Sequence, residues 1–339
     1  MKTLTIIMAG SLLLALAAAA MAAMPSKATQ PKDPTDPFEN APATNVRRPD
    51  KVFVYKNTPQ GDLRMHMYLP TDWKPSDKRP VIVFFHGGGW SAGKPDQLFS
   101  RAEYFASRGL VTISVEYRVL KPHGTTPEKS FMDSRSAMRY VRKNAATLGI
   151  DPDKIIASGS SAGGVLACAM AVQSGMDEPG EDTSVSYRPQ AAIIFGNCPD
   201  TSGKASRWRG TPEEAKGKQY SMEMSPSHHI APGCPPMIQF SGSKDVYVKQ
   251  CLIAFTEKML AAGNRIELYI APGQPHGFHG EAPWLQAVTI KTDEFLTSLG
   301  YLSGPPTWKP TDLKAQLIKL LPRDPSATSQ PTIDEISGN

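Results

Sequence analysis

A single short stretch, residues 154–172, places the strongest constraint on how this chain can fold. Residues 159–163 read Gly-Ser-Ser-Ala-Gly and fit the pattern G-x-S-x-G, with Ser161 at its centre. The residues before it, 154–158, predict a β-strand, and the small apolar residues 165–172 predict a helix. Ser161 is therefore expected at a strained strand-to-helix corner that exposes its hydroxyl as a candidate nucleophile. The pentapeptide alone leaves open a Ser/Gly-rich loop that merely turns the chain.

Strands and helices are predicted to alternate along most of the chain. The predicted strands are 52–55 and 63–69, which form an antiparallel hairpin, then 81–85, 111–116, 154–158, 191–195, 237–240 and 266–270. The predicted helices are 96–107, 127–148, 165–172, 248–262 and 285–299. This alternation favours an α/β fold, with a mostly parallel sheet, an N-terminal antiparallel hairpin and helices on both faces.

A serine hydroxyl becomes a good nucleophile when a neutral imidazole takes its proton and a carboxylate supports that imidazole. In a parallel sheet, such partners come from loops at the carboxyl ends of later strands. Asp245 follows the predicted strand 237–240, and His276 follows the predicted strand 266–270. We therefore predict a catalytic triad of Ser161, Asp245 and His276, in the chain order Ser, Asp, His.

Each partner has rivals in the sequence. Asp200 also follows a predicted strand and is the reserve candidate for the acid. His86 follows a strand too, but it is expected to orient the adjacent glycine loop and not to act as the base. The remaining histidines, among them His279 just beyond His276, are expected to be satisfied or solvent-facing side chains.

A glycine-rich loop, residues 86–90 with the sequence His-Gly-Gly-Gly-Trp, follows the first buried strand. Attack on a carbonyl places negative charge on its oxygen, and each preorganised backbone N–H donor stabilises that charge by about 3 kcal/mol. Because glycines allow close approach, Gly88 and Gly89 are predicted to form an oxyanion hole with the N–H of Ala162, and Gly87 remains possible. A plain flexible loop is the alternative for the triple glycine alone.

Five regions are expected along the chain of 339 residues. An apolar N-terminal stretch ending in small residues predicts a signal peptide over residues 1–23, so the protein is expected to be secreted or periplasmic, without a stable membrane anchor. A Pro-rich linker is expected over 24–50 and an α/β catalytic domain over 51–303. Within that domain, residues 199–232 form an irregular, lid-like insertion or a plain surface excursion. A partly disordered tail is expected over 304–339.

Composition narrows the possible partners. The formal charge of +5 is spread along the chain without basic runs, which does not indicate nucleic-acid binding. The four cysteines allow disulfides in an oxidising compartment, and a bridge between Cys198 and Cys234 is expected because they bracket the irregular insertion. Cys168 is expected to be a buried thiol. The cysteine spacing matches no zinc site, and neither a metal nor a cofactor is expected.

Residues 86–90 and 159–163, with Asp245 and residues 276–278, together resemble the secreted esterases of the α/β-hydrolase superfamily. The resemblance is to the branch of hormone-sensitive lipase and the bacterial acetyl esterases, and it runs from about Val52 to Leu302. It implies the α/β-hydrolase fold, with the triad and oxyanion residues named above. One departure is that a Pro-rich linker occupies the place of an N-terminal helical cap, which casts doubt on a large acyl pocket.

The expected function is that of a serine carboxylic-ester hydrolase that removes short acyl groups, such as acetyl, from a carbohydrate or a small ester. An amidase or peptidase of the same fold is the nearest alternative. A catalytically silent binding protein on a hydrolase scaffold is a second alternative, which the complete set of candidate residues disfavours. The sequence does not indicate an oligomeric state.

Overall fold

The computed structural model describes residues 46–202, 222–309 and 316–320. The expected signal peptide, the expected linker up to residue 45, and the insertion from 203 to 221 lie outside the described residues. So do residues 310–315 and 321–339 of the expected tail. Within the described part of the chain, no helix is long and apolar enough to cross a membrane.

The described residues form a nine-stranded sheet in the order β1-β2-β4-β3-β5-β6-β7-β8-β9. Its strands are β1 Lys51–Thr58, β2 Gly61–Tyr68, β3 Arg79–Phe85, β4 Val111–Val115, β5 Ile150–Ser160, β6 Ala191–Phe195, β7 Met237–Gly242, β8 Ile266–Ala271 and β9 Ile318–Leu320. The neighbouring pairs β4–β3, β3–β5, β5–β6, β6–β7 and β7–β8 are parallel. The pairs β1–β2, β2–β4 and β8–β9 are antiparallel. The predicted mostly parallel sheet with an N-terminal hairpin is confirmed.

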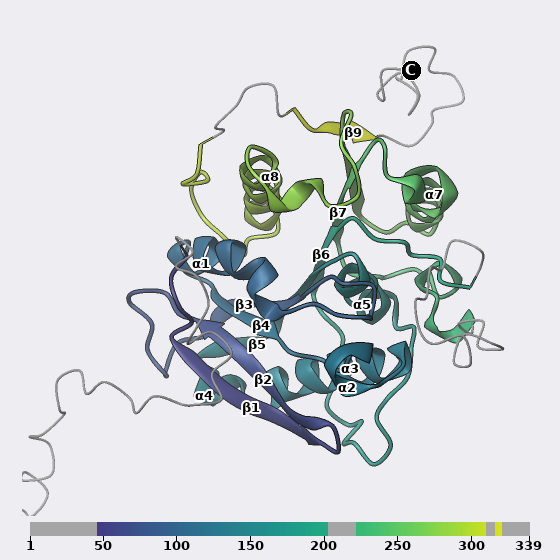
Figure 1. Ribbon diagram of the computed structural model, residues 1–339. Helices are drawn as coiled ribbons and strands as arrows, with labels where there is room; N and C mark the ends of the chain where they lie inside the picture. The colour runs from purple at the N-terminus through teal and green to yellow at the C-terminus, as the bar shows by residue number, and fades with distance from the viewer. Residues whose placement is uncertain (1–45, 203–221, 310–315, 321–339) are drawn as a thin grey trace, which may run out of the picture. The chain divides into compact units, whose positions relative to one another are not determined.

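Helices cover both faces of this sheet (Figure 1). They are α1 Phe99–Ser107, α2 Leu120–His123, α3 Pro127–Lys143, α4 Ala145–Leu148, α5 Ala162–Val172, α7 Ile253–Ala261 and α8 Trp284–Ser298. Figure 1 shows α1 and α8 on one side and α3, α5 and α7 on the other. The hydroxyl of Tyr104 on α1 donates to Asp293 of α8 over 2.7 Å, which joins the first pair.

Two predicted helices are broken where the local backbone departs from the α-helix. The helix expected over 127–148 is interrupted at Asn144, whose side-chain amide donates to the carbonyl of Tyr140 over 2.8 Å and so ends α3. The helix expected over 248–262 begins with a π-helical turn, Val248–Leu252, before α7. Such turns are rare and often occur near functional sites.

The strand order reverses at β3, and this reversal positions the site. The chain runs from β3 to β4 on one side of β3 and then returns to β5 on the other side. Phe85 pairs with Gly159, so the carboxyl ends of β3 and β5 lie level with each other. In open α/β sheets, ligands bind at such a topological switch point, outside the carboxyl ends of the strands.

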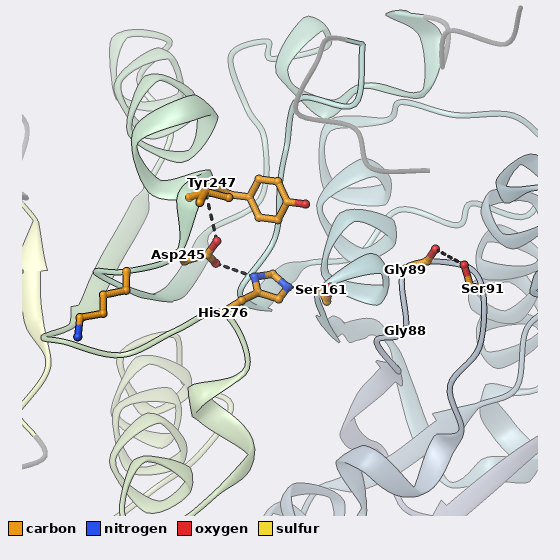
Figure 2. Close-up of a pocket in the computed structure, with 9 residues that line it drawn as sticks. Gly88, Gly89, Ser91, Ser161, Asp245, Tyr247 and His276 are labelled. Atoms are coloured by element: carbon orange, nitrogen blue, oxygen red, sulfur yellow. Dashed lines mark hydrogen bonds and ion pairs between the residues drawn. The ribbon is translucent and has the colours of Figure 1, made fainter. Parts of the chain in front are cut away.

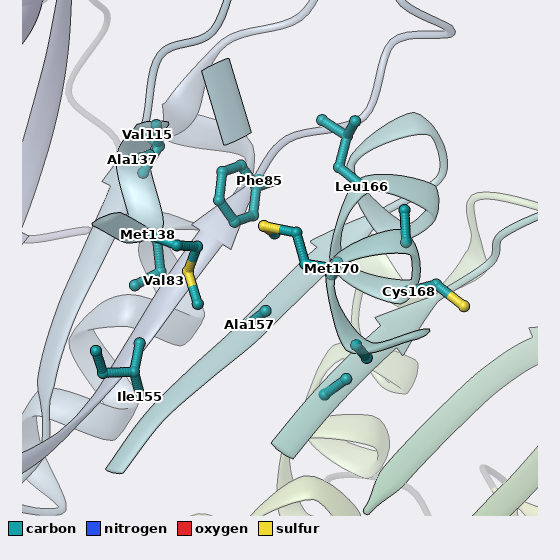
Figure 3. Packing of buried hydrophobic residues seen from close by; sticks show 14 of the residues in the cluster. Val83, Phe85, Val115, Ala137, Met138, Ile155, Ala157, Leu166, Cys168 and Met170 are labelled. Carbon is teal, nitrogen blue, oxygen red and sulfur yellow. The ribbon is translucent and has the colours of Figure 1, made fainter. Parts of the chain in front are cut away.

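The main core lies between the sheet and the helices α3 and α5. Figure 3 shows Val83 and Phe85 of β3 packed near Met138 of α3 and Met170 of α5. Each of these four side chains is at most 1% exposed. Ile82 and Phe84, which point to the other face of the sheet, are buried as well, which explains why residues 81–85 of β3 are apolar without interruption.

The hairpin and the tail differ in part from expectation. Leu63, Met65 and Met67 are fully buried as their alternation predicted, but His66 is buried as well because β2 lies between β1 and β4. In the C-terminal tail, the short strand β9 pairs with β8, and Lys319 forms an ion pair with Glu267 at 2.8 Å. The sequence did not predict this strand.

Candidate active site

Ser161 occupies the corner between β5 and α5, with φ 51° and ψ −115°. This left-handed conformation is uncommon for a residue with a side chain and is maintained by its surroundings. The Ser161 N–H donates to the carbonyl of Phe195 over 2.8 Å. A Cβ atom at Gly159 would lie 2.2 Å from the carbonyl oxygen of Gly163, and one at Gly163 would lie 2.1 Å from that of Phe85. Both flanking glycines are therefore sterically required.

The structure brings Ser161, His276 and Asp245 together from three different loops (Figure 2). The Nε2 atom of His276 lies 2.9 Å from Ser161 Oγ, and its Nδ1 atom lies 2.6 Å from Asp245 Oδ2. Asp245 is almost fully buried and accepts two further hydrogen bonds, from the hydroxyl of Ser241 and from the backbone N–H of Tyr247, both over 3.1 Å. These bonds hold the carboxylate against the imidazole.

The glycine loop lies on the opposite side of Ser161 from His276 (Figure 2). Gly88 has φ 128° and Gly89 has φ 59°. The carbonyl of Gly88 accepts hydrogen bonds from the backbone N–H groups of Ser91 and Ala92, over 3.1 and 3.2 Å, which closes a tight turn. A Cβ atom at Gly88 would lie 1.9 Å from the carbonyl oxygen of Ala92.

The hydrogen bonds of Gly87 and the helix position of Ala162 distinguish these two candidates for the oxyanion hole. The N–H of Gly87 donates to Gln97 Oε1 over 2.9 Å and is therefore engaged elsewhere. Ala162 is the first residue of α5, and the first N–H groups of a helix have no partner within the helix. The N-terminus of α5 also carries a partial positive charge beside Ser161.

His86 supports the loop and does not approach the serine. Its ring stacks on Tyr117 at a centroid distance of 4.2 Å, and its Nδ1 atom lies 2.8 Å from the carbonyl of Gly87. Burial lowers its pKa to about 4, so the imidazole is neutral at pH 7. Neutral His86 can thus donate from Nδ1 to the glycine loop.

Asp200, the reserve acid, belongs to a different cluster. Its Oδ1 atom accepts from the hydroxyls of Ser202 and Ser225, over 2.7 and 3.2 Å, and lies 3.8 Å from Nε2 of His228. Partial burial raises the pKa of Asp200, but these hydrogen bonds outweigh it and leave the pKa lowered. His276 has its close carboxylate contact with Asp245 instead.

His279 is a satisfied side chain, one of the two alternatives expected for it, but its nearness to Ser161 was not predicted from the sequence. It is buried, and its Nε2 atom lies 3.1 Å from the hydroxyl of Ser160, the residue before Ser161. The guanidinium of Arg101 donates to His279 Nδ1 over 3.2 Å and also to its carbonyl. Burial lowers the pKa of Arg101 to about 9 and lowers that of His279 well below its usual value. Because Nδ1 accepts, the His279 proton lies on Nε2 and is donated to Ser160.

Two hollows meet at the serine. The larger has a volume of about 480 Å³ and is lined by Gly88, Gly89, Ser91, Ser161, Lys244, Asp245, Val246, Tyr247 and His276. The smaller, of about 60 Å³, is lined in part by Trp90, Ala162, Val165, Cys198 and Thr201. Gly89, Ser161, Tyr247 and His276 border both. Lys244 and Tyr247 lie within two positions of Asp245 in the sequence, and this nearness to the candidate acid could have identified them as lining residues.

The expected bridge between Cys198 and Cys234 is wrong. Cys198 Sγ lies 2.9 Å from Cys251 Sγ, whereas Cys234 Sγ donates to the carbonyl of Ala231 over 3.1 Å. Cys198 follows the carboxyl end of β6, whereas Cys234 precedes the amino end of the neighbouring parallel strand β7, so the two cysteines lie toward opposite ends of these strands. The backbone N–H of Cys234 donates there to Asn264 Oδ1 over 2.9 Å. Cys168 is buried in α5 as expected. The described residues contain no cluster of three or more His, Cys, Asp or Glu suited to a metal ion.

Comparisons with known proteins agree with this architecture. The BD-FAE family model matches residues 65–259. Carboxylesterase NlhH of Mycobacterium tuberculosis is 43% identical over 112 residues, a match covering 32% of this chain and 34% of NlhH. The chain thus matches only about a third of the length of that curated relative. Esterase LipI of the same species is 26% identical over 256 residues, covering 71% of this chain and 78% of LipI.

A solved structure provides the more extensive match. Esterase 2 of Thermogutta terrifontis is 40% identical, with a TM-score of 0.69, and the match covers 75% of this chain and 96% of that one. Further structures of this esterase contain propionate or butyrate, and one is phosphonylated by sarin. The chain belongs to the BD-FAE family, within the esterase branch of the α/β-hydrolase superfamily that its motifs resemble.

Proposed function

We propose that this protein is a serine carboxylic-ester hydrolase that works through an acyl-enzyme. The observation that carries the proposal is the continuous hydrogen-bonded row from Asp245 through His276 to Ser161, with distances of 2.6 and 2.9 Å. Both distances lie within the range that proton transfer requires. The esterase relatives support the same reaction class.

In the proposed first half-reaction, Ser161 Oγ attacks the ester carbonyl while its proton passes to His276 Nε2. Asp245 accepts a hydrogen bond from Nδ1–H and stabilises the imidazolium that forms. The backbone N–H groups of Gly88, Gly89 and Ala162 stabilise the negative oxygen of the tetrahedral intermediate. His276 then donates its proton to the leaving alcohol, which leaves an acyl group on Ser161.

In the proposed second half-reaction, His276 takes a proton from a water molecule, which attacks the acyl-enzyme. The acid leaves and Ser161 regains its proton from His276. The open hollow of about 480 Å³ allows water and alcohol to exchange beside His276. His276 accepts or donates the proton in each step of this proposed reaction cycle.

We further propose that the preferred acyl group is short, acetyl or similar, and that the alcohol is a carbohydrate or a small molecule. The hollow of about 60 Å³ between Trp90 and Val165 supports a short acyl group, because a longer chain gains about 0.8 kcal/mol per CH₂ only where a wall buries it. The larger hollow, bordered by Lys244 and Tyr247, supports a bulkier alcohol. The related esterase with bound propionate or butyrate is consistent with this size.

A panel of chromogenic esters from acetyl to decanoyl tests the proposal, alongside acetylated polysaccharides and an anilide. We expect kcat/KM to peak with acetyl or propionyl and to fall by octanoyl. A profile rising through decanoyl would overturn the short-acyl proposal, and preferential anilide cleavage would favour an amidase. Ser161→Ala should abolish hydrolysis and phosphonate labelling, with an unchanged melting temperature. A rate within tenfold of the wild type would contradict Ser161 as the nucleophile.

We also propose export through the N-terminal apolar stretch, with removal of residues 1–23. The small residues that end this stretch support the proposal. N-terminal sequencing of the protein recovered from a bacterial host should begin near residue 23 or 24. An intact Met1 in the exported fraction would contradict it.

A further inference from the structure

Two cysteines from separate elements meet beside the smaller hollow. Cys198 follows β6, and Cys251 lies in the π-helical turn that precedes α7. Their Sγ atoms are 2.9 Å apart, although the residues are 53 positions apart in the chain. Cys198 and Cys251 are 9% and 5% exposed, so both thiols face the protein interior.

The other two cysteines have different surroundings. Cys168 is fully buried in α5. Cys234 is partly exposed, and its thiol donates to a backbone carbonyl of its own turn. A disulfide requires sulfurs about 2.05 Å apart and facing Cβ atoms. Among the described sulfur contacts, the pair of Cys198 and Cys251 comes nearest to this requirement.

We propose that Cys198 and Cys251 form a disulfide when the chain folds in the presence of a disulfide donor. The reaction is a thiol–disulfide exchange in two steps. A thiolate of one cysteine attacks the donor, releasing one donor thiol and forming a mixed disulfide, which the second cysteine then resolves. In total the two cysteines lose two protons and two electrons, and the donor disulfide is reduced to two thiols.

The thiol–disulfide exchange would occur while the chain folds, before the native structure has packed around the two cysteines. The hydrogen bond with Cys251 and burial both raise the pKa of the Cys198 thiol. A raised pKa depletes the thiolate, which is the reactive species. Both cysteines are at most 9% exposed, and the hollow that Cys198 lines, of about 60 Å³, is too small to admit a donor of the size of glutathione once the sheet and helices have packed. For the same reason, a disulfide formed during folding resists reduction in the native state.

The bond would link the two walls of the catalytic pocket. Cys198 Sγ contacts the carbonyl of Asp200 at 3.1 Å, and Cys251 Sγ contacts that of Tyr247 at 3.5 Å. Asp200 and Tyr247 both border the smaller hollow. Because the closed loop is long, the disulfide removes much conformational freedom from the unfolded chain. We expect a melting temperature about 5–10 °C higher in the oxidised form.

The full chain, refolded from denaturant with oxidised glutathione or with dithiothreitol, tests this assignment. Alkylation and mass spectrometry should find two free thiols after oxidative refolding and four after reductive refolding. Peptide mapping should recover one linked pair that contains Cys198 and Cys251. The difference in melting temperature between the two preparations should vanish in Cys251→Ser and persist in Cys234→Ser, the matched control.

Three outcomes would overturn the proposal. They are four free thiols after oxidative refolding, a linked pair that contains Cys168 or Cys234, and a difference in melting temperature that survives Cys251→Ser. If the serine variant fails to fold, the peptide map of the wild-type protein still decides between these assignments.

Discussion

Ser161 Oγ lies 2.9 Å from His276 Nε2, although 115 positions separate the two residues in the chain. The contact depends on the parallel pairing of β5, β6, β7 and β8, which brings the loops after β5 and β8 to the same edge of the sheet. Asp245, on the loop after β7, reaches the far nitrogen of the same ring. The sheet thus assembles the proposed triad from its carboxyl edge.

Asp245→Asn should lower kcat by roughly 10⁴, because the imidazolium loses its supporting charge and the ring loses its tautomer preference. Asp200→Asn is the matched control, since Asp200 bonds to Ser202 and Ser225 and not to His276. That variant should retain kcat within about threefold, a loss of under 1 kcal/mol in transition-state stabilisation. Steady-state kinetics on an acetyl ester measures both. The reverse pattern would assign the acid to the loop after β6.

His276→Gln and His279→Gln should separate the base from its buried neighbour. Loss of His276 removes the proton acceptor and should reduce kcat by several orders of magnitude with little change in stability. Loss of His279 breaks buried hydrogen bonds to Ser160 and Arg101, so it should lower the free energy of unfolding by about 1–3 kcal/mol. Kinetics and urea unfolding of both variants test this. A larger kcat loss in His279→Gln than in His276→Gln would refute it.

Gly88→Ala and Gly89→Ala introduce the same methyl group at two positions of the glycine loop, which differ in the room available for it. Both glycines have positive φ, so alanine costs about 1–2 kcal/mol of strain at either position. Only at Gly88 would the new Cβ meet a neighbour, 1.9 Å from the Ala92 carbonyl, whereas nothing lies within 4 Å at Gly89. Gly88→Ala should therefore displace the loop and reduce kcat by about 10²–10³. Equal losses of kcat in the two variants would show that the loop relieves the contact with the Ala92 carbonyl without moving its backbone N–H donors.

Stability should rise with pH across the range in which buried His86 would titrate when unfolded. The folded pKa is about 4 because of burial, compared with about 6.5 in an unfolded chain. Between these values the unfolded state binds more protons, so stability is lost as pH falls, by about 1.4 kcal/mol per pH unit from His86 alone. Burial of His279 acts in the same direction.

Urea unfolding at pH 5, 6 and 7 measures the change in the free energy of unfolding with pH. The carboxylate of Glu178, whose pKa is lowered to about 2, changes the free energy of unfolding mainly below this pH range. His86→Gln keeps a donor near the carbonyl of Gly87 and should flatten the slope. A slope that is the same in the variant would exclude His86 as its source.

The sequence alone predicted most of the strands and helices, and it named three residues that the structure brings together at one edge of the sheet. Apolar runs such as 81–85 and 191–195 are strands in the structure, and a strand buried on both faces needs no polar residue at every second position. Asp245 and His276 could be named because polar residues that directly follow buried strands collect at one edge of a parallel sheet. The glycines around Ser161 were predictable because local backbone geometry, set by near neighbours, excludes larger residues there.

The tertiary structure decided the features that depend on contacts between distant segments. The nearness of Cys198 to Cys251, the burial of His279 beneath Ser160 and the pairing of β9 with β8 have no local sequence pattern. Each of them results from how whole elements pack. The sequence indicates which residues are apolar and where the chain turns. The distance between two side chains that are remote in the sequence is set by the strand order and helix packing of the entire domain.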